Sequence, residues 1–298
     1  MVSFFFEVLI GGLLSGVMYS LVALGFVLIY KASGVFNFAQ GSLVFFAALT
    51  FVGLTEHGLS FGAALAVTLA VMNVLGLLIE RLVLRPLVNQ PQISLFMATI
   101  GLSFFIEGLA QLMWGANVRG LELGIQDEPI KWLSDTLGIN VSKFDLVAAG
   151  IAAVLVAGLG LFFSRTRIGR ALRAVADDHQ AALAVGIPLQ QIWGIVWAVA
   201  GFVALVAGML WGARNGVQFA LTFVALKALP VLILGGFESI PGAIVGGLII
   251  GATEKLAEVF LGPYVGGGIE GWFPYVLALL FLLVRPEGLF GEKIIRRI

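Results

Sequence analysis

The sequence predicts an all-α membrane protein, a polytopic helical bundle of about eight or nine transmembrane helices. Of its 298 residues, 60% are hydrophobic and only 11% are charged, and the mean hydropathy is +1.07. Soluble domains are about 45–50% apolar and about 25% charged, and a soluble core of this size cannot bury the excess. Lipid can solvate it. Because the composition never changes along the chain, we expect one transmembrane domain over residues 1–298.

Nine apolar stretches approach the length of about 20 residues that a membrane span requires. The stretches 34–54 and 217–236 contain polar residues and glycines, and the last stretch is short. We therefore expect two or three of the nine to be broken or re-entrant. The predicted spans are 5–30, 34–54, 60–80, 93–115, 144–164, 191–211, 217–236, 240–261 and 272–285.

The distribution of basic residues predicts the orientation, because cytoplasmic loops are enriched in Lys and Arg. Nine alternating spans place eleven basic residues on one side of the membrane and four on the other. We therefore expect the N-terminus outside and the C-terminus in the cytoplasm, with 116–143 as the external loop and 165–190 as the longest cytoplasmic loop. The eleven are Lys31, Arg81, Arg85, Arg165, Arg167, Arg170, Arg173, Arg285, Lys293, Arg296 and Arg297; the four are Arg119, Lys131, Lys143 and Arg214.

Several function classes lack the residues they need. The chain has no cysteine, only two histidines and no GxxxxGK[ST] phosphate loop, so we expect no catalytic residues, no metal site and no ATP site of its own. The formal net charge is zero, which gives no reason to expect a nucleic-acid partner. A membrane-embedded enzyme would also need a nucleophile–base set that is missing here.

The segment TRIGRALRAVADDHQAALAVGIP, residues 166–188, predicts two short amphipathic helices at the membrane face. Ile168, Leu172 and Val175 recur at helical spacing, with arginines on the other side. Asp178 is placed to cap the second helix, and Gly186 followed by Pro188 would end it. Such a basic segment can lie on anionic lipid, or it can dock a soluble partner.

Within that segment, Gln180-Ala181-Ala182-x-x-x-Gly186 resembles the E-A-A-x-x-x-G motif of bacterial ABC importer permeases. Glutamine stands in place of glutamate, and the usual I-x-L-P ending is absent. The chain is more closely similar to one branch, the branched-chain amino acid (LivH-type) permeases. That resemblance extends in order over nearly the whole chain, through the segments 12–43, 169–188, 231–251 and 284–291.

The resemblance implies a multi-pass permease subunit in the bacterial inner membrane. It implies a second related permease subunit, two cytoplasmic ATP-binding subunits that carry the ATP and Mg, and a periplasmic solute-binding protein. The solute would be a branched-chain amino acid, although similar permeases serve urea, amides and aromatic acids. The loop 165–190 would be the coupling loop, with Arg170, Arg173, Gln180, Ala181, Ala182 and Gly186 as its contact residues.

Four polar residues inside predicted spans are candidates for the substrate path. Asn37 and Gln40 lie three residues apart between Gly34 and Gly41, so they share one face of a helix or a glycine-permitted break. They could equally form hydrogen bonds that only hold the helices together.

Glu107 is a carboxylate at membrane depth, which is a functional hypothesis by default, although it could pair with a base or stay protonated. Lys227 could neutralise a carboxylate such as Glu107, or extend to the membrane interface. The pair Glu254 and Glu258 favours a solvated helix end. A stand-alone secondary transporter or channel remains the rival function, and Glu107 is its best candidate for an ion-coupling carboxylate.

Overall fold

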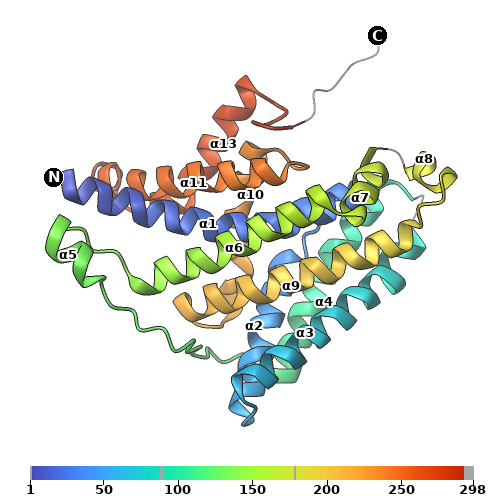
Figure 1. The fold of residues 1–298 in the computed structure, drawn as a ribbon, viewed down its shortest axis with the longest axis horizontal. Coiled ribbons are helices and arrows are strands. Elements are labelled where there is room, and N and C mark those ends of the chain that lie inside the picture. The colour runs from blue at the N-terminus through green and yellow to red at the C-terminus, as the bar shows by residue number, and fades with distance from the viewer. Residues whose placement is uncertain (1, 88–89, 178, 292–298) are drawn as a thin grey trace. The chain divides into compact units, whose positions relative to one another are not determined.

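The computed structural model describes residues 2–87, 90–177 and 179–291, and in these ranges the chain is helical with two isolated β-bridges and no strand (Figure 1). The predicted basic residues Lys293, Arg296 and Arg297 and the predicted cap Asp178 lie outside the described residues. The α-helices are α1 (Val2–Ser33), α2 (Gln40–Glu56), α3 (Phe61–Leu78), α4 (Gln92–Trp114), α5 (Lys131–Leu137), α6 (Lys143–Arg165), α7 (Arg167–Asp177), α8 (His179–Ala184), α9 (Leu189–Asn215), α10 (Val224–Gly235), α11 (Ile240–Phe260), α12 (Gly262–Val265) and α13 (Phe273–Val284). A π-helix, η1 (Ile79–Leu84), extends α3, and 3-10 turns form at η2 (Arg85–Leu87), η3 (Phe219–Phe223) and η4 (Ile269–Gly271).

Each predicted span overlaps a described helix. The stretch 34–54 is helical only from Gln40 onward, and the stretch 217–236 forms a bent pair with the next helix; these are the two stretches in which glycines and polar residues predict a break. In the described ranges five helices are long and apolar enough to cross a bilayer: α1, α3 with its extension to Leu87, α4, α6 and α9. The pair formed by 219–235 and 240–260 bends by 114° and gives a sixth apolar unit. Helices α2 and α13 are shorter, with 17 and 12 residues. The chain is therefore a multi-pass helical membrane protein with five or six long apolar spans.

The side of α4 that faces away from the rest of the chain requires lipid. Phe104, Phe105 and Leu112 are 71%, 62% and 84% exposed. A contiguous apolar face of this kind is not stable in water.

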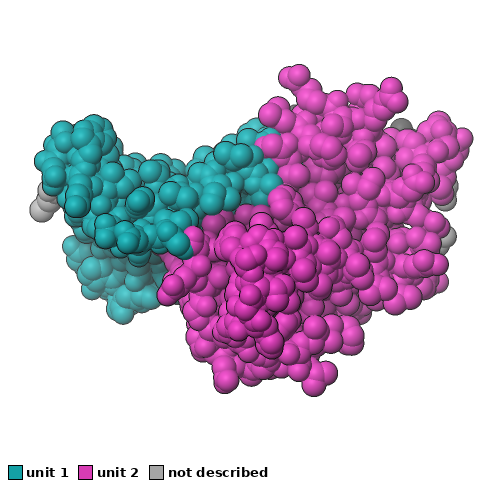
Figure 2. Space-filling model, turned by 60° about the horizontal axis from the view of Figure 1, so that its bottom comes forward, with its two compact units in different colours: residues 1–23, 124–157, 226–298 teal, residues 24–123, 158–225 magenta. Residues whose placement is uncertain are grey.

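The chain divides into two compact units (Figure 2). Unit 1 consists of residues 1–23, 124–157 and 226–298, and unit 2 of residues 24–123 and 158–225. In unit 2, α9 packs against both α2 and α3 through glycines. A Cβ on Gly208 would lie 2.5 Å from the Val44 carbonyl oxygen, and one on Gly76 would lie 3.1 Å from that of Trp197. Close backbone approach through small residues is the usual way in which membrane helices associate.

In unit 1 the N-terminal part of α1 lies along α11 (Figure 1). A Cβ on Gly12 would lie 2.6 Å from the Gly251 carbonyl oxygen, and one on Gly247 would lie 2.6 Å from that of Gly16. Two glycines four residues apart on each helix thus face each other. The absence of side chains at these glycines allows the backbones of α1 and α11 to approach closely.

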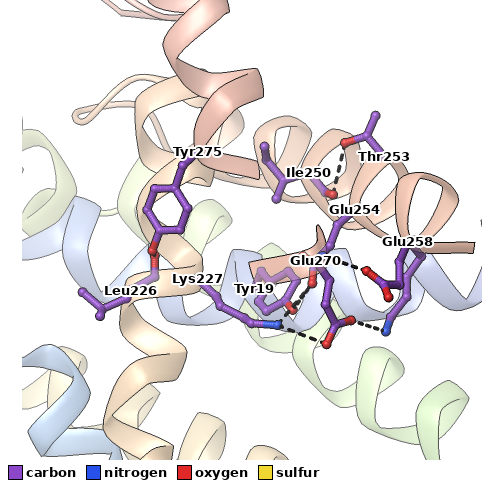
Figure 3. Close-up of polar contacts among 10 residues, drawn as sticks. Tyr19, Leu226, Lys227, Ile250, Thr253, Glu254, Glu258, Glu270 and Tyr275 are labelled. Atoms are coloured by element: carbon purple, nitrogen blue, oxygen red, sulfur yellow. Dashed lines mark hydrogen bonds and ion pairs between the residues drawn. The ribbon is translucent and has the colours of Figure 1, made fainter. Parts of the chain in front are cut away.

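The proline inside α10 leaves one carbonyl without its helical partner, and α13 supplies a replacement. Pro230 has no N–H to donate to the carbonyl of Leu226, four residues earlier. The hydroxyl of Tyr275 donates to that carbonyl at 2.7 Å (Figure 3). A hydrogen bond between two helices thus satisfies a polar group that the helix itself cannot satisfy.

An ionic network joins α1, α10, α11 and η4 in unit 1 (Figure 3). Glu254 is 1% exposed, and its Oε1 accepts from the Lys227 ammonium at 3.3 Å and from the Tyr19 hydroxyl at 3.2 Å. Lys227 also lies 3.9 Å from Glu270, which pairs with Lys255 at 3.0 Å. Two cations and two carboxylates make the network neutral, as burial in a low-dielectric region requires.

The network corrects the expectation that Glu254 occupies a solvated helix end. The following carboxylate, Glu258, is at such an end, where it accepts from the backbone N–H groups of Gly268 and Glu270 at 2.9 Å each. Lys227 does neutralise a carboxylate, and that carboxylate is Glu254, four residues before Glu258 on α11. The sequence could not select this partner because the hairpin between α10 and α11 sets the register.

Removing the Lys227 ammonium should destabilise unit 1. Replacing Lys227 with methionine leaves the buried Glu254 without its nearest cation, a change that costs about 3–5 kcal/mol for fully buried pairs. The loss should be smaller here because the Lys227 side chain is 36% exposed. We expect a lower apparent melting temperature in detergent, largely restored by adding Glu254→Gln, whereas Lys131→Met on exposed α5 serves as the control. An unchanged melting temperature for Lys227→Met would contradict this role.

Candidate functional site

The segment 165–190 forms the two short helices that its sequence predicts, α7 and α8. Helix α7 buries Gly169, Leu172 and Val175 and leaves Arg170 exposed, as its amphipathic pattern requires. The predicted coupling residue Gln180 lies in α8.

Arg173 fastens α7 to the end of α6. Its guanidinium donates to the carbonyl of Phe163 at 2.9 Å and to that of Ser164 at 3.5 Å. The last carbonyls of a helix have no intrahelical donor and favour a nearby positive charge. A Cβ on Gly169 would overlap the Phe163 carbonyl, so the backbones of α7 and α6 are in direct contact. Arg173 and Gly169 thus hold α7 against the last turn of α6.

Gly186 ends α8 through its backbone conformation. Its φ is +83°, its N–H donates to the Leu183 carbonyl at 3.0 Å, and the N–H of Ile187 donates to the Ala182 carbonyl at 2.9 Å. This pair of bonds is the Schellman motif, which favours glycine at its left-handed position. Among the described residues no atom lies within 4 Å of a Cβ built on Gly186. The positive φ, and not a lack of space, therefore favours glycine at this position.

Helix α8 and the residues after it expose apolar side chains that the sequence analysis did not single out. Leu183 and Val185 are 54% and 75% exposed, whereas the motif residue Ala182 is 2% exposed and Ala181 is exposed. Local spacing gives no such signal, because Val185 follows the buried Ala182 by three residues, and residues at that spacing share one face of a helix.

Of the two predicted amides, Asn37 lies in the break between α1 and α2, residues 34–39, and Gln40 is the first residue of α2. Asn37 is part of the turn, since its Oδ1 accepts from the backbone N–H of Ala39 at 3.1 Å. Thr99 of α4 satisfies the neighbouring backbone: its hydroxyl oxygen accepts from the Phe38 N–H at 3.2 Å and lies 3.2 Å from the Phe36 carbonyl oxygen. Non-helical backbone at membrane depth is stable only when protein groups satisfy it in this way.

The amides themselves remain incompletely satisfied. Asn37 and Gln40 are 0% exposed, and the Asn37 Nδ2 and the Gln40 Nε2 and Oε1 have no hydrogen-bond partner among the described residues. The Gln40 side chain lies against Gly25 of α1, where any Cβ would overlap its amide. The break therefore holds three buried polar atoms whose capacity for hydrogen bonds is unused.

Glu107 of α4 lies beside Ser42 of α2, which is two residues after Gln40 and therefore on a different face of that helix. Its Oε1 accepts from the Ser42 hydroxyl at 2.8 Å and from the Ser103 hydroxyl at 3.3 Å, and the two hydroxyl oxygens are 2.6 Å apart. Within the described part of the chain this carboxylate has hydroxyl partners and no ion pair. Hydroxyl groups alone leave a negative charge at this depth poorly compensated.

A cavity of about 300 Å³ opens within unit 2, one helical turn from the Glu107 cluster. Gln111 follows Glu107 by four residues on α4, and Phe45 follows Ser42 by three residues on α2, so both lie on the faces that carry the cluster. Three amides and two phenylalanines give the cavity both polar and apolar walls. Its lining residues are Phe45, Gln111, Ala116, Asn117, Gln218 and Phe219.

The structure thus brings three of the four predicted path residues into unit 2 and places Lys227 in the ionic network of unit 1. The sequence analysis missed Thr99, Ser103 and Gln111, which share α4 with Glu107. A signal existed: these four polar residues recur at intervals of four within the apolar stretch 93–115, and this spacing places them along one side of a helix.

Comparison with known proteins gives concordant results over the whole chain. Residues 8–285 match the family described as the permease component of branched-chain amino acid transport systems. The chain is 30% identical to the high-affinity branched-chain amino acid transport permease BraD of Pseudomonas aeruginosa, covering 99% of this chain and 98% of BraD. It is 28% identical to the LivH permease of Salmonella typhimurium with the same coverage.

The fold has a relative among solved structures. PsaBC from Streptococcus pneumoniae, solved in complex with a Fab, aligns with a TM-score of 0.51 at 17% identity over 95% of both chains, which establishes similarity of fold. The family match covers well over half of the sequence, and the described residues within it form apolar helices of membrane-spanning length. The chain therefore belongs to the family of permease components of branched-chain amino acid transport systems.

Proposed function

We propose that the chain is the transmembrane permease subunit of an ABC importer for branched-chain amino acids or a related small polar solute. Family membership carries this proposal. The chain would supply no ATPase site. Two separate cytoplasmic ATP-binding subunits would hold the ATP and Mg, a second related permease would complete the path, and a periplasmic solute-binding protein would deliver the solute.

The proposed topology places the protein in the bacterial inner membrane with eight or nine spans, which requires counting the short helices α2 and α13. The N-terminus would lie outside and the C-terminus in the cytoplasm, in agreement with eleven basic residues against four. Residues 116–143, which include α5, would form the outer loop, and 165–190 the cytoplasmic coupling loop.

Segment 165–190 would connect the ATP-binding subunit with the membrane helices. On one side, Arg170, Leu183 and Val185 are exposed and available to the ATP-binding subunit. On the other side, Arg173 links α7 to α6, and α8 leads through residues 185–188 into α9, which packs on α2 and α3. Closure of the ATP-binding subunits would thus move the helices that surround Asn37, Gln40 and Glu107, the proposed path.

Charged residues at the exposed apolar positions should separate the ATP-binding subunit from the permease. The double variant Leu183→Asp, Val185→Asp places two carboxylates where we propose an apolar contact, at positions that are 54% and 75% exposed. We expect the ATP-binding subunit to be lost from affinity purification and solute uptake to fall at least about 10-fold. Thr136→Asp on exposed α5 is the control. Retention of a full complement of ATP-binding subunit by the double variant would refute the docking role, as would uptake that needs no ATPase.

The end of α8 should be required for coupling because of its backbone conformation. Gly186→Val forces a β-branched residue into a φ of +83° and should cost roughly 1–2 kcal/mol of local stability. Gly58 offers a matched control, since its φ is +90° and it too has no atom within 4 Å of a built Cβ. We expect Gly186→Val to lose solute-stimulated ATPase activity and Gly58→Val to keep it, with equal membrane insertion. Equal activity of the two variants would contradict the proposal.

A further inference from the structure

Helix α4 carries a polar row on one side and a lipid-exposed apolar face on the other. Thr99, Ser103, Glu107 and Gln111 recur at steps of four residues, and together they extend roughly 18 Å along the helix at about 1.5 Å per residue. That is more than half of the hydrocarbon thickness of about 30 Å. A row of this length exceeds what one interhelical hydrogen bond requires.

The four residues of this row have different contacts. Thr99 is committed to the backbone of the α1–α2 break. Ser103 is committed to Glu107, as is Ser42 of α2. Gln111 lines the cavity. The row therefore leads from the cavity to a carboxylate held by two hydroxyls and, within the described residues, by no cation.

The chemistry of this cluster selects one class of ligand. A carboxylate beside two hydroxyl oxygens offers acceptors to a group with three N–H donors and one positive charge, which is a primary ammonium. Neutralisation by such a ligand would remove the cost of a carboxylate located about seven residues, roughly 10 Å, below the end of α4. Urea, amides and simple carboxylic acids carry no such charge.

The residues that line the cavity complement the carboxylate and the side chain of an amino acid. Gln111, Asn117 and Gln218 present amide groups that can donate to a carboxylate, and Phe45 and Phe219 present apolar surface to an aliphatic side chain. The volume of about 300 Å³ is at the small end of the range for ligand sites.

Resting on the proposed function, we propose that Glu107, Ser42 and Ser103, which lie one helical turn from the cavity residues Gln111 and Phe45, form an ammonium-binding subsite beside this cavity. The transported solute is thereby restricted to compounds with a primary amino group. Binding the solute neutralises Glu107, and Gln111 marks the entrance to the subsite.

The first test compares substitutions at Glu107 in the complete transporter. Glu107→Gln keeps the size and hydrogen bonds of the side chain but not its charge, so leucine uptake should fall about 10- to 100-fold, the worth of a charge-assisted hydrogen bond. Glu107→Asp should retain intermediate uptake. The amount of transporter in the membrane and the amount of ATP-binding subunit that co-purifies should match wild type in both, and Glu122→Gln on the exposed loop is the control.

Unchanged uptake in Glu107→Gln would show that Glu107 is only a packing group and would overturn the proposal. Loss of the transporter from the membrane, or of the ATP-binding subunit from purification, in both Glu107 variants would overturn it too, because that result assigns the residue to folding or assembly.

A second test measures binding directly and uses the absence of cysteine from the sequence. A single cysteine at Gln111 should react with a small cationic thiol reagent, and leucine or isopentylamine should slow the reaction at least about fivefold by occupying the subsite. The des-amino analogue 4-methylpentanoate should not slow it. Thr136→Cys on α5 should react equally under all conditions. Equal protection by 4-methylpentanoate would contradict ammonium recognition.

The two tests separate this inference from the proposed function. If wild type imports leucine and the Glu107 and Gln111 variants behave like their controls, the subsite is wrong and the importer remains. If wild type fails to import leucine although amines protect the cysteine at 111, the subsite stands and the importer proposal fails.

Discussion

The hydrocarbon of a bilayer offers no hydrogen bonds, and this constraint determines where almost every polar group of the chain lies. The non-helical break at 34–39 is stable because Thr99 and Asn37 bond its backbone. The carbonyl that Pro230 leaves free is taken by Tyr275. The buried carboxylate of Glu254 is neutralised by Lys227. In each case a protein side chain supplies what water would supply in a soluble protein.

The same constraint makes the exceptions informative. Asn37 and Gln40 retain unused hydrogen-bonding atoms, and Glu107 has hydroxyl partners but no cation among the described residues. All three are in unit 2, within the helices α2 and α4 or the break beside them. In unit 1, by contrast, Lys227 and Lys255 pair with Glu254 and Glu270, as expected of residues with a structural role. At the end of α8, exposed Leu183 and Val185 are apolar groups that the proposed ATP-binding subunit would cover.

Local patterns in the sequence predict much of this arrangement and fail where distant residues meet. Apolar length predicted a helix within each of the nine apolar stretches, although not α5 or α12, and glycine with polar residues indicated the interruptions at 34–39 and 236–239, because these signals are local in the chain. The end of α8 at Gly186 was predictable for the same reason. The partners of Lys227 and Glu107 were not, since the register between helices decides which residues face each other. Glu254 was assigned to a solvated end because its neighbour Glu258 is there. The spacing of four residues was enough to predict the polar row on α4. The hydrogen bond between Ser42 and Glu107, however, could be found only in the structure.

Hydrogen–deuterium exchange in lipid nanodiscs tests the central claim most directly. The backbone N–H groups of Phe38 and Ala39 lie outside any helix, yet Thr99 and Asn37 accept from them, so they should exchange as slowly as the interior of α2. Thr99→Val removes the acceptor for Phe38 and should raise its exchange selectively. Exchange of both groups at the rate of the open loop around Gly124 would show that water and not the protein satisfies the break, and would contradict the account.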